Sequence, residues 1–141
     1  MKPFVFALFL FLIGCAAEPE PLAYGKDQCH ACKMTLMDRK FGAELVTKKG
    51  KVYKFDDINC LFNFYKGTDV SKEDYQHTLV IDFSQPEKLI DAQKAYFLKS
   101  SEVMSPMASG VAAFEFQNSE LTTNWQATPL TWQELEKQFG E

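Results

Sequence analysis

The chain has 141 residues and a mass of 16.1 kDa, enough for one compact domain or for two very small units that share a core. Hydrophobic residues make up 46% of the chain and aromatic residues 14%, which excludes an intrinsically disordered protein. The formal net charge is −4, and the densest group of lysines, at residues 48–51, has the character of a charged turn. A nucleic-acid partner is therefore not expected, because proteins that bind nucleic acids carry a basic surface.

Residues 1–14 have the composition of an export signal. Lys2 provides a positive charge near the amino terminus, and residues 4–13 form an unbroken apolar run. This run is too short to span a bilayer, which requires about 20 residues, but it has the length of a signal-peptide core. Gly14 and Cys15 follow, and they resemble the cleavage site of bacterial lipoproteins, in which the cysteine thiol receives a diacylglyceryl group. An ordinary secretory signal with a chance cysteine is the alternative.

The mature protein is thus predicted to begin at Cys15 and to face the periplasm from the inner or the outer membrane. Residues 15–24 would form the lipid anchor and a short polar tether, because residues 16–22 are rich in proline and glutamate. The compartment beyond the membrane is oxidising. The remaining cysteines must therefore be disulfide-bonded, bound to a metal or kept reactive.

Residues 25–84 predict a first unit of mixed strand and helix. Segments 42–47 and 52–55 flank the turn at residues 48–51 and predict a β-hairpin. Residues 78–83 predict a strand that returns to the sheet. A helix is predicted between the hairpin and this strand. It would begin at the acidic pair Asp56 and Asp57 and end at Gly67. The apolar residues between them have helical spacing: Ile58, Leu61, Phe62 and Tyr65.

Residues 85–141 resemble a weaker copy of this pattern. Segments 95–99 and 111–116 predict strands, and residues 117–129 are polar and rich in turn formers. Thr131 and Glu134 form a capping-box pattern at the start of a helix that ends near Gly140. The fold class predicted from these elements is α+β, with two small related units packed together.

The residues most suited to chemistry lie in one short segment. Cys29, His30, Cys32 and Met34 place two thiols, an imidazole and a thioether within six residues. If residues 32–34 are extended, the side chains of Cys32 and Met34 point to the same face. Thiolates and thioethers are soft ligands, which select Cu(I) over hard ions.

A second segment that carries methionine lies in the other half of the chain. Pro106 and Gly110 mark residues 104–110 as a loop, so Met104 or Met107 is expected on a flexible segment instead of in a core. A flexible ligand suits a carrier that must release its ion.

Each of these residues also has a structural interpretation. A Cys-x-x-Cys pair in an exported protein is often a disulfide, and methionines such as Met37 are usually core residues. Cys60 lies beside the apolar stripe of the predicted helix, where it would be a buried thiol, a disulfide partner of Cys29 or Cys32, or a spare ligand. Asp56 and Asp57 are interpreted as a helix N-cap and its neighbour, not as a catalytic pair.

Taken together, these residues resemble the NosL family. The matching segments follow one another in the family's order: Cys15, Cys29-His30-Ala31-Cys32-Lys33-Met34, Phe41-Gly42-Ala43, Lys54-Phe55-Asp56-Asp57-Ile58-Asn59-Cys60, Ser105-Pro106-Met107 and Ala112-Ala113-Phe114. The resemblance implies a periplasmic lipoprotein that delivers Cu(I) for the copper–sulfide centre of nitrous oxide reductase. It also implies a fold of two related ββαβ units.

The resemblance implies Cys32 and Met34 as Cu(I) ligands, with Met107 from the second unit and Cys29 or His30 completing the set. Cys60 and Met104 are further candidates. Lys33 departs from the family pattern, because many members have glycine at this position. A lysine beside a thiolate site lowers the pKa of the cysteine, so it is compatible with metal binding.

Three other functions are open at this point. A thiol–disulfide oxidoreductase would use Cys29 and Cys32, but the pair does not open a helix after a strand, which is the usual means of lowering the pKa of the nucleophile. A structural lipoprotein would simply hold a disulfide. A zinc site requires four strong ligands, which are hard to assemble from three cysteines and two distant histidines. A Cu(I) chaperone without enzymatic activity is the preferred interpretation.

Overall fold

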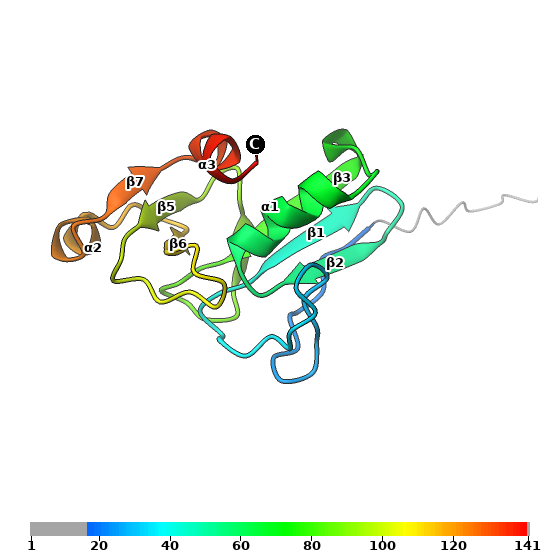
Figure 1. The fold of residues 1–141 in the computed structure, drawn as a ribbon, viewed down its shortest axis with the longest axis horizontal. Coiled ribbons are helices and arrows are strands. Elements are labelled where there is room, and N and C mark those ends of the chain that lie inside the picture. Colours follow the sequence, from blue (N-terminus) through cyan, green and yellow to red (C-terminus); the bar gives the residue numbers. More distant parts are fainter. Residues whose placement is uncertain (1–16, 141) are drawn as a thin grey trace, which may run out of the picture.

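The computed structural model describes residues 17–140, so the predicted signal peptide and Cys15 lie outside the described residues. Within this range, two antiparallel sheets and three α-helices form an α+β fold, as predicted (Figure 1). The two sheets lie side by side, and helix α1 lies across the first of them (Figure 1). None of the helices between residues 17 and 140 has the length and apolar character that a membrane span requires.

The first sheet has the strand order β2-β1-β3-β4, and all neighbouring strands in it are antiparallel. The hairpin, the helix and the returning strand confirm the elements predicted for the first unit. The edge strand β4 was not predicted, because three residues are too few to show an alternating pattern. The elements are β1 (Ala43–Thr47), β2 (Val52–Phe55), α1 (Ile58–Gly67), a 3₁₀ helix η1 (Lys72–Asp74), β3 (Tyr75–Ile81) and β4 (Leu89–Asp91).

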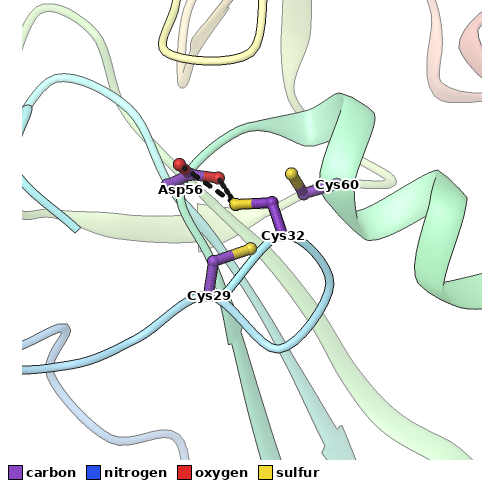
Figure 2. Close-up of side chains that lie close together, drawn as sticks. All are labelled: Cys29, Cys32, Asp56 and Cys60. Carbon is purple, nitrogen blue, oxygen red and sulfur yellow. Dashed lines mark hydrogen bonds between the residues drawn. The ribbon is translucent and has the colours of Figure 1, made fainter. Parts of the chain in front are cut away.

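Helix α1 begins where its sequence predicts. Asp57 is the N-cap, with an extended backbone (φ −149°) and a side chain that accepts a hydrogen bond from the Asn59 N–H. The apolar stripe of the helix packs against the core, and its first turn also buries Cys60. The Cys60 thiol points from this turn toward the loop that holds Cys29 and Cys32 (Figure 2).

The second unit repeats the order of the first. Its sheet runs β6-β5-β7, which corresponds to β2-β1-β3, and a short helix again precedes the third strand. This helix and this strand lie within residues 117–129, which were predicted only as polar and turn-rich. None of the six residues of the helix is buried, so it has no apolar stripe. The elements are β5 (Tyr96–Lys99), β6 (Val111–Phe114), α2 (Ser119–Asn124), β7 (Thr128–Leu130) and an added helix α3 (Trp132–Phe139), which begins with the predicted capping box.

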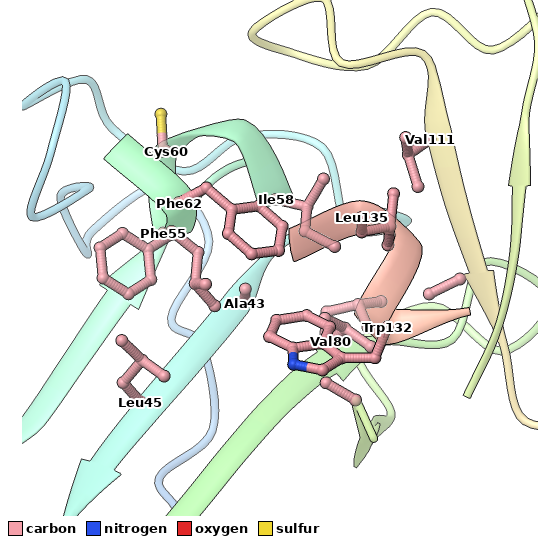
Figure 3. Packing of buried hydrophobic residues seen from close by; sticks show 14 of the residues in the cluster. Ala43, Leu45, Phe55, Ile58, Cys60, Phe62, Val80, Val111, Trp132 and Leu135 are labelled. Carbon is pink, nitrogen blue, oxygen red and sulfur yellow. The ribbon is translucent and has the colours of Figure 1, made fainter. Parts of the chain in front are cut away.

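One hydrophobic core joins the two units. Phe62 of α1 stacks on Trp132 of α3, with ring centroids 5.1 Å apart (Figure 3). It also stacks on Phe139 of α3, at a centroid distance of 5.9 Å. The same buried cluster continues from Phe55 of the first sheet to Val111 of the second. Because α1 is packed from both sides, the position of its first turn, and of Cys60 within it, is fixed by the core.

The chain before the first sheet is packed on that sheet from Ala17 onward, since Ala17 and Leu22 are both buried. The Glu20 N–H donates to Glu44 Oε1 of β1 at 3.0 Å. Gly42 leaves room for Leu22, because a Cβ at Gly42 would lie 2.6 Å from the leucine side chain. Lys54 Nζ donates to the Pro21 carbonyl at 3.1 Å. These contacts fix the start of the loop that carries Cys29 and Cys32.

Candidate metal centre

The loop of residues 28–35 closes on itself and turns its two cysteines inward. Gln28 and Thr35 form an isolated antiparallel bridge, and the Cys29 N–H donates to the Met34 carbonyl at 2.8 Å. The turn between them includes a left-handed residue, Lys33, with φ +67°. Residues 32–34 are therefore not extended, and the condition under which Cys32 and Met34 would share one face does not hold.

Three cysteines and one aspartate meet beneath this loop. The Sγ atoms of Cys29, Cys32 and Cys60 and a carboxylate oxygen of Asp56 all lie within 4.8 Å of one another (Figure 2). Cys29 and Cys60 are buried, whereas Cys32 is partly exposed. The Cys32 thiol donates to both carboxylate oxygens of Asp56 at 3.6 Å. None of the three cysteines in residues 17–140 forms a disulfide.

The cluster comes from three separate elements. Cys29 and Cys32 lie on the loop, Asp56 directly follows β2, and Cys60 lies in the first turn of α1. The loop is tied to β2 by two hydrogen bonds between His30 and the backbone of Lys54: the His30 N–H donates to the Lys54 carbonyl at 2.8 Å, and the ring Nδ1 of His30 accepts from the Lys54 N–H at 3.0 Å. The fold thus gathers the three sulfurs at one point.

The three thiols differ in acidity because of the hydrogen bonds between them and because of burial. A hydrogen bond from the Cys60 thiol, together with backbone N–H groups of the loop, lowers the pKa of Cys29 to about 6. The same hydrogen bond raises the pKa of Cys60, and burial adds to the effect. Burial is the main cause that raises the pKa of Cys32. Cys29 is therefore the thiol that becomes a thiolate first, held by donors around its sulfur.

Residues 23–127 match the sequence model of the NosL family. The chain belongs to the NosL family. Its fold is similar to the crystal structure of the copper chaperone NosL from Shewanella denitrificans, with a TM-score of 0.67 and 21% sequence identity. The alignment covers 84% of this chain and 95% of that chain. No curated relative matches the chain.

The backbone at Lys33 is left-handed, a conformation that favours glycine. A φ of +67° strains an ordinary L-residue but not glycine. This chain places a lysine there, and Lys33 Nζ donates to the His30 carbonyl at 2.7 Å. The departure from the family pattern thus leaves the shape of the cysteine loop intact.

The other sequence candidates differ in how exposed they are. The side chain of Met34 is 56% exposed and that of Met104 is 84% exposed, whereas Met107 is partly buried against the core. His30 is exposed, and its ring packs edge-on against Tyr53 at a centroid distance of 5.3 Å. Met37, expected as a core residue, is 72% exposed because it lies on the loop that leads to β1.

The sequence named Cys60 only as a further candidate ligand and did not place Asp56 at the site, whereas both belong to the cluster. Asp57 is the N-cap, as predicted, but its neighbour Asp56 accepts from the Cys32 thiol instead of serving the helix. Cys60 enters the cluster because the first turn of α1 faces the cysteine loop (Figure 2). The available signal was a cysteine in the first turn of a capped helix, directly after a strand end.

Proposed function

We propose that this NosL-family protein is a copper chaperone that holds one Cu(I) ion at the sulfurs of Cys29, Cys32 and Cys60. The observation that carries the proposal is the convergence of three unbridged cysteine sulfurs within 4.8 Å, two of them buried. Thiolates are soft ligands, and the buried environment favours transfer of the ion to a partner over its loss to water.

Ion uptake would begin at Cys29. Its lowered pKa of about 6 makes the thiolate available near neutral pH, and the bound ion would then displace the protons of the other two thiols. Cu(I) affinity should therefore fall on acidification. The similar structure from Shewanella denitrificans is that of a copper chaperone, which agrees with this chemistry.

Release would use the exposed side of the centre. Cys32 is partly exposed, and Met34, two residues along the chain, is exposed over more than half of its surface. Met34 and Met107 are the further ligands that the family resemblance implies. An acceptor that brings its own soft ligands would exchange them at Cys32, and family membership suggests the copper–sulfide centre of nitrous oxide reductase as the destination.

The proposed setting is the periplasmic face of a membrane, with the protein anchored through lipid on Cys15. The sequence of residues 1–15 supports this, and the described chain starts packing on the domain at Ala17. In cells, the unmodified chain is expected to incorporate labelled palmitate and a Cys15→Ser variant is not. Equal labelling of the two chains would contradict lipid anchoring through Cys15.

The first test is anaerobic Cu(I) titration of the reduced, detergent-solubilised protein, followed by native mass spectrometry. One Cu(I) per chain is expected, and Cys32→Ser should abolish tight uptake. Met37→Leu is the matched control, because Met37 is an exposed methionine on the same stretch of chain. Transfer is tested by mixing the loaded protein with copper-free nitrous oxide reductase and comparing it with a Cu(I)–chelator complex at equal free Cu(I).

A zinc centre is the second candidate, and Asp56 favours it. Sequence reasoning lacked a fourth strong ligand, but three cysteines and a carboxylate oxygen complete the set that tetrahedral Zn²⁺ requires. Competition between Zn²⁺ and Cu(I) for the reduced protein separates the two. Displacement of bound Zn²⁺ by a single equivalent of Cu(I) supports the chaperone, and the reverse supports a zinc site.

The thiol arrangement does not favour an oxidoreductase. The cysteine with the lowered pKa, Cys29, is fully buried and cannot reach a disulfide substrate, while the pKa of the accessible Cys32 is raised. A redox enzyme requires the opposite arrangement, with the acidic thiol at the surface. We therefore propose that the protein is not an enzyme.

A further inference from the structure

One buried carboxylate joins the helix that carries Cys60 to the loop that carries Met107. Asp57 is 1% exposed, and its Oδ1 accepts from the Asn59 N–H at the start of α1 at 3.3 Å. Its Oδ2 accepts from Ser105 Oγ at 2.8 Å and from the Met107 N–H at 2.9 Å. A longer contact from the Ser109 N–H, at 3.4 Å, completes the set. The role of Asp57 thus exceeds that of a helix cap.

The peptide groups of Met107 are held at both ends. Its N–H donates to Asp57, and its carbonyl accepts from Asn59 Nδ2 at 3.3 Å. Both partners belong to the turn of α1 that ends in Cys60. Met107 is accordingly partly buried, whereas Met104, three residues earlier, is 84% exposed. The fold therefore selects one of the two methionines and seats it beside the cysteine helix.

The loop itself is built to keep this position. Ser105 Oγ and Ser109 Oγ lie 3.0 Å apart, and the Gly110 N–H donates to Ser105 Oγ at 3.1 Å. Ala108 adopts φ +56°, a left-handed conformation that is costly outside glycine and persists only where the surroundings fix it. The expectation of a flexible methionine loop therefore does not describe residues 105–110, which form a hydrogen-bonded turn clamped by Asp57.

We propose that Asp57 is a positioning residue for the metal centre, which acts by fixing Met107 where its thioether completes the Cu(I) ligand set. The inference rests on the proposed function. Asp57 does not bind the ion. It joins the first turn of α1, which carries Cys60, to the loop of the second unit that carries Met107. Loss of a group that orients a metal ligand typically weakens metal binding by about 10- to 100-fold.

The test is a double-mutant cycle on Cu(I) affinity, measured by anaerobic competition with a Cu(I) chelator. Asp57→Asn keeps a good helix N-cap but replaces one oxygen that accepts from the loop by an amide that cannot accept. Asp57→Asn and Met107→Leu should each weaken binding by about 10-fold, and the double variant should be no weaker than Met107→Leu alone. A purely structural role for Asp57 would instead give effects that multiply.

Asp82→Asn is the matched control. Asp82 is also 1% exposed, and it accepts from the Ser84 N–H at 2.8 Å and from the Glu115 N–H at 3.3 Å, outside the cysteine cluster. This variant should lower the melting temperature without changing Cu(I) affinity. If Asp57→Asn fails to fold, Ser105→Ala removes one hydrogen bond of the same clamp and should show the same dependence on Met107.

The outcomes separate this inference from the proposed function. If the unmodified protein binds Cu(I) tightly but either Asp57→Asn or Met107→Leu leaves the affinity unchanged, the positioning role is wrong and the chaperone stands. Multiplying effects in the double variant also overturn the positioning role. If the unmodified protein does not bind Cu(I), the proposed function fails, and this inference fails with it.

Discussion

The Glu44→Gln substitution should change how the stability of the protein depends on pH. Glu44 is the second residue of β1 and is fully buried. Its Oε1 accepts from the Glu20 N–H, but its Oε2 has no hydrogen-bond partner among residues 17–140. Burial therefore raises the pKa of this carboxyl from 4.5 to about 7, even though Lys54 opposes the shift.

The sign of the effect follows from proton binding. Between pH 4.5 and about 7, the unfolded chain releases the Glu44 proton while the folded chain keeps it. The unfolded state then binds fewer protons, so the free energy of unfolding falls as the pH rises. A pKa difference of about 2.5 units corresponds to about 3 kcal/mol. The contribution of protonated Glu44 to the free energy of unfolding is fully present below pH 4.5 and is lost by pH 7 to 8.

Urea unfolding of the reduced, metal-free protein at several pH values measures this directly. Glutamine resembles the protonated acid, so the two proteins should be equally stable at pH 4.5, and Glu44→Gln should be about 3 kcal/mol more stable at pH 8. Glu102→Gln, at an exposed glutamate, is the control and should leave the profile unchanged. A stability difference between Glu44→Gln and the unmodified protein that is constant over pH, or of opposite sign, would refute the reasoning.

Three further predictions concern the cysteine loop, the core and the choice of metal. Lys33→Gly should raise the free energy of unfolding by about 1 kcal/mol in urea denaturation, because glycine relieves the left-handed strain; a loss of stability would contradict this. Trp132→Ala should lower the free energy of unfolding by about 4 kcal/mol in the same assay, because Trp132 is 4% exposed and stacks on Phe62. A loss below about 1 kcal/mol would mean that the two units do not depend on a shared core. Asp56→Asn should weaken Zn²⁺ binding about 10-fold or more in competition titrations, because Zn²⁺ uses the carboxylate oxygen. The Cu(I) affinity should stay within about threefold, because Cu(I) is bound by sulfur. Equal losses for both ions would argue against the sulfur-only Cu(I) centre.

The elements with strong local signals were predictable from the sequence. The hairpin around residues 48–51 follows from its turn and its flanking apolar segments, and the capping box at Thr131 and Glu134 marks the start of α3. Helix α2 and strand β7 carry no such signal, because they are short and largely exposed. The place of β7 in the fold is set by its pairing with β5, a tertiary contact that local patterns do not contain.

The metal centre was predictable in its chemistry but not in its membership. The spacing of Cys29 and Cys32 brings two sulfurs together in any tight turn, so soft-metal binding could be anticipated. Cys60 and Asp56 join them only because the end of β2 and the first turn of α1 pack beneath the loop. The clamp on Met107 depends in the same way on a contact between residues about 50 positions apart in sequence.

The central claim is that all three cysteines bind the ion, and Cu(I) affinities of the single variants Cys29→Ser, Cys32→Ser and Cys60→Ser test it most directly. Anaerobic competition with a Cu(I) chelator should show at least about a 10-fold loss for each variant, with Met37→Leu unchanged. If Cys32→Ser weakens binding while Cys29→Ser and Cys60→Ser do not, the three-sulfur centre is wrong.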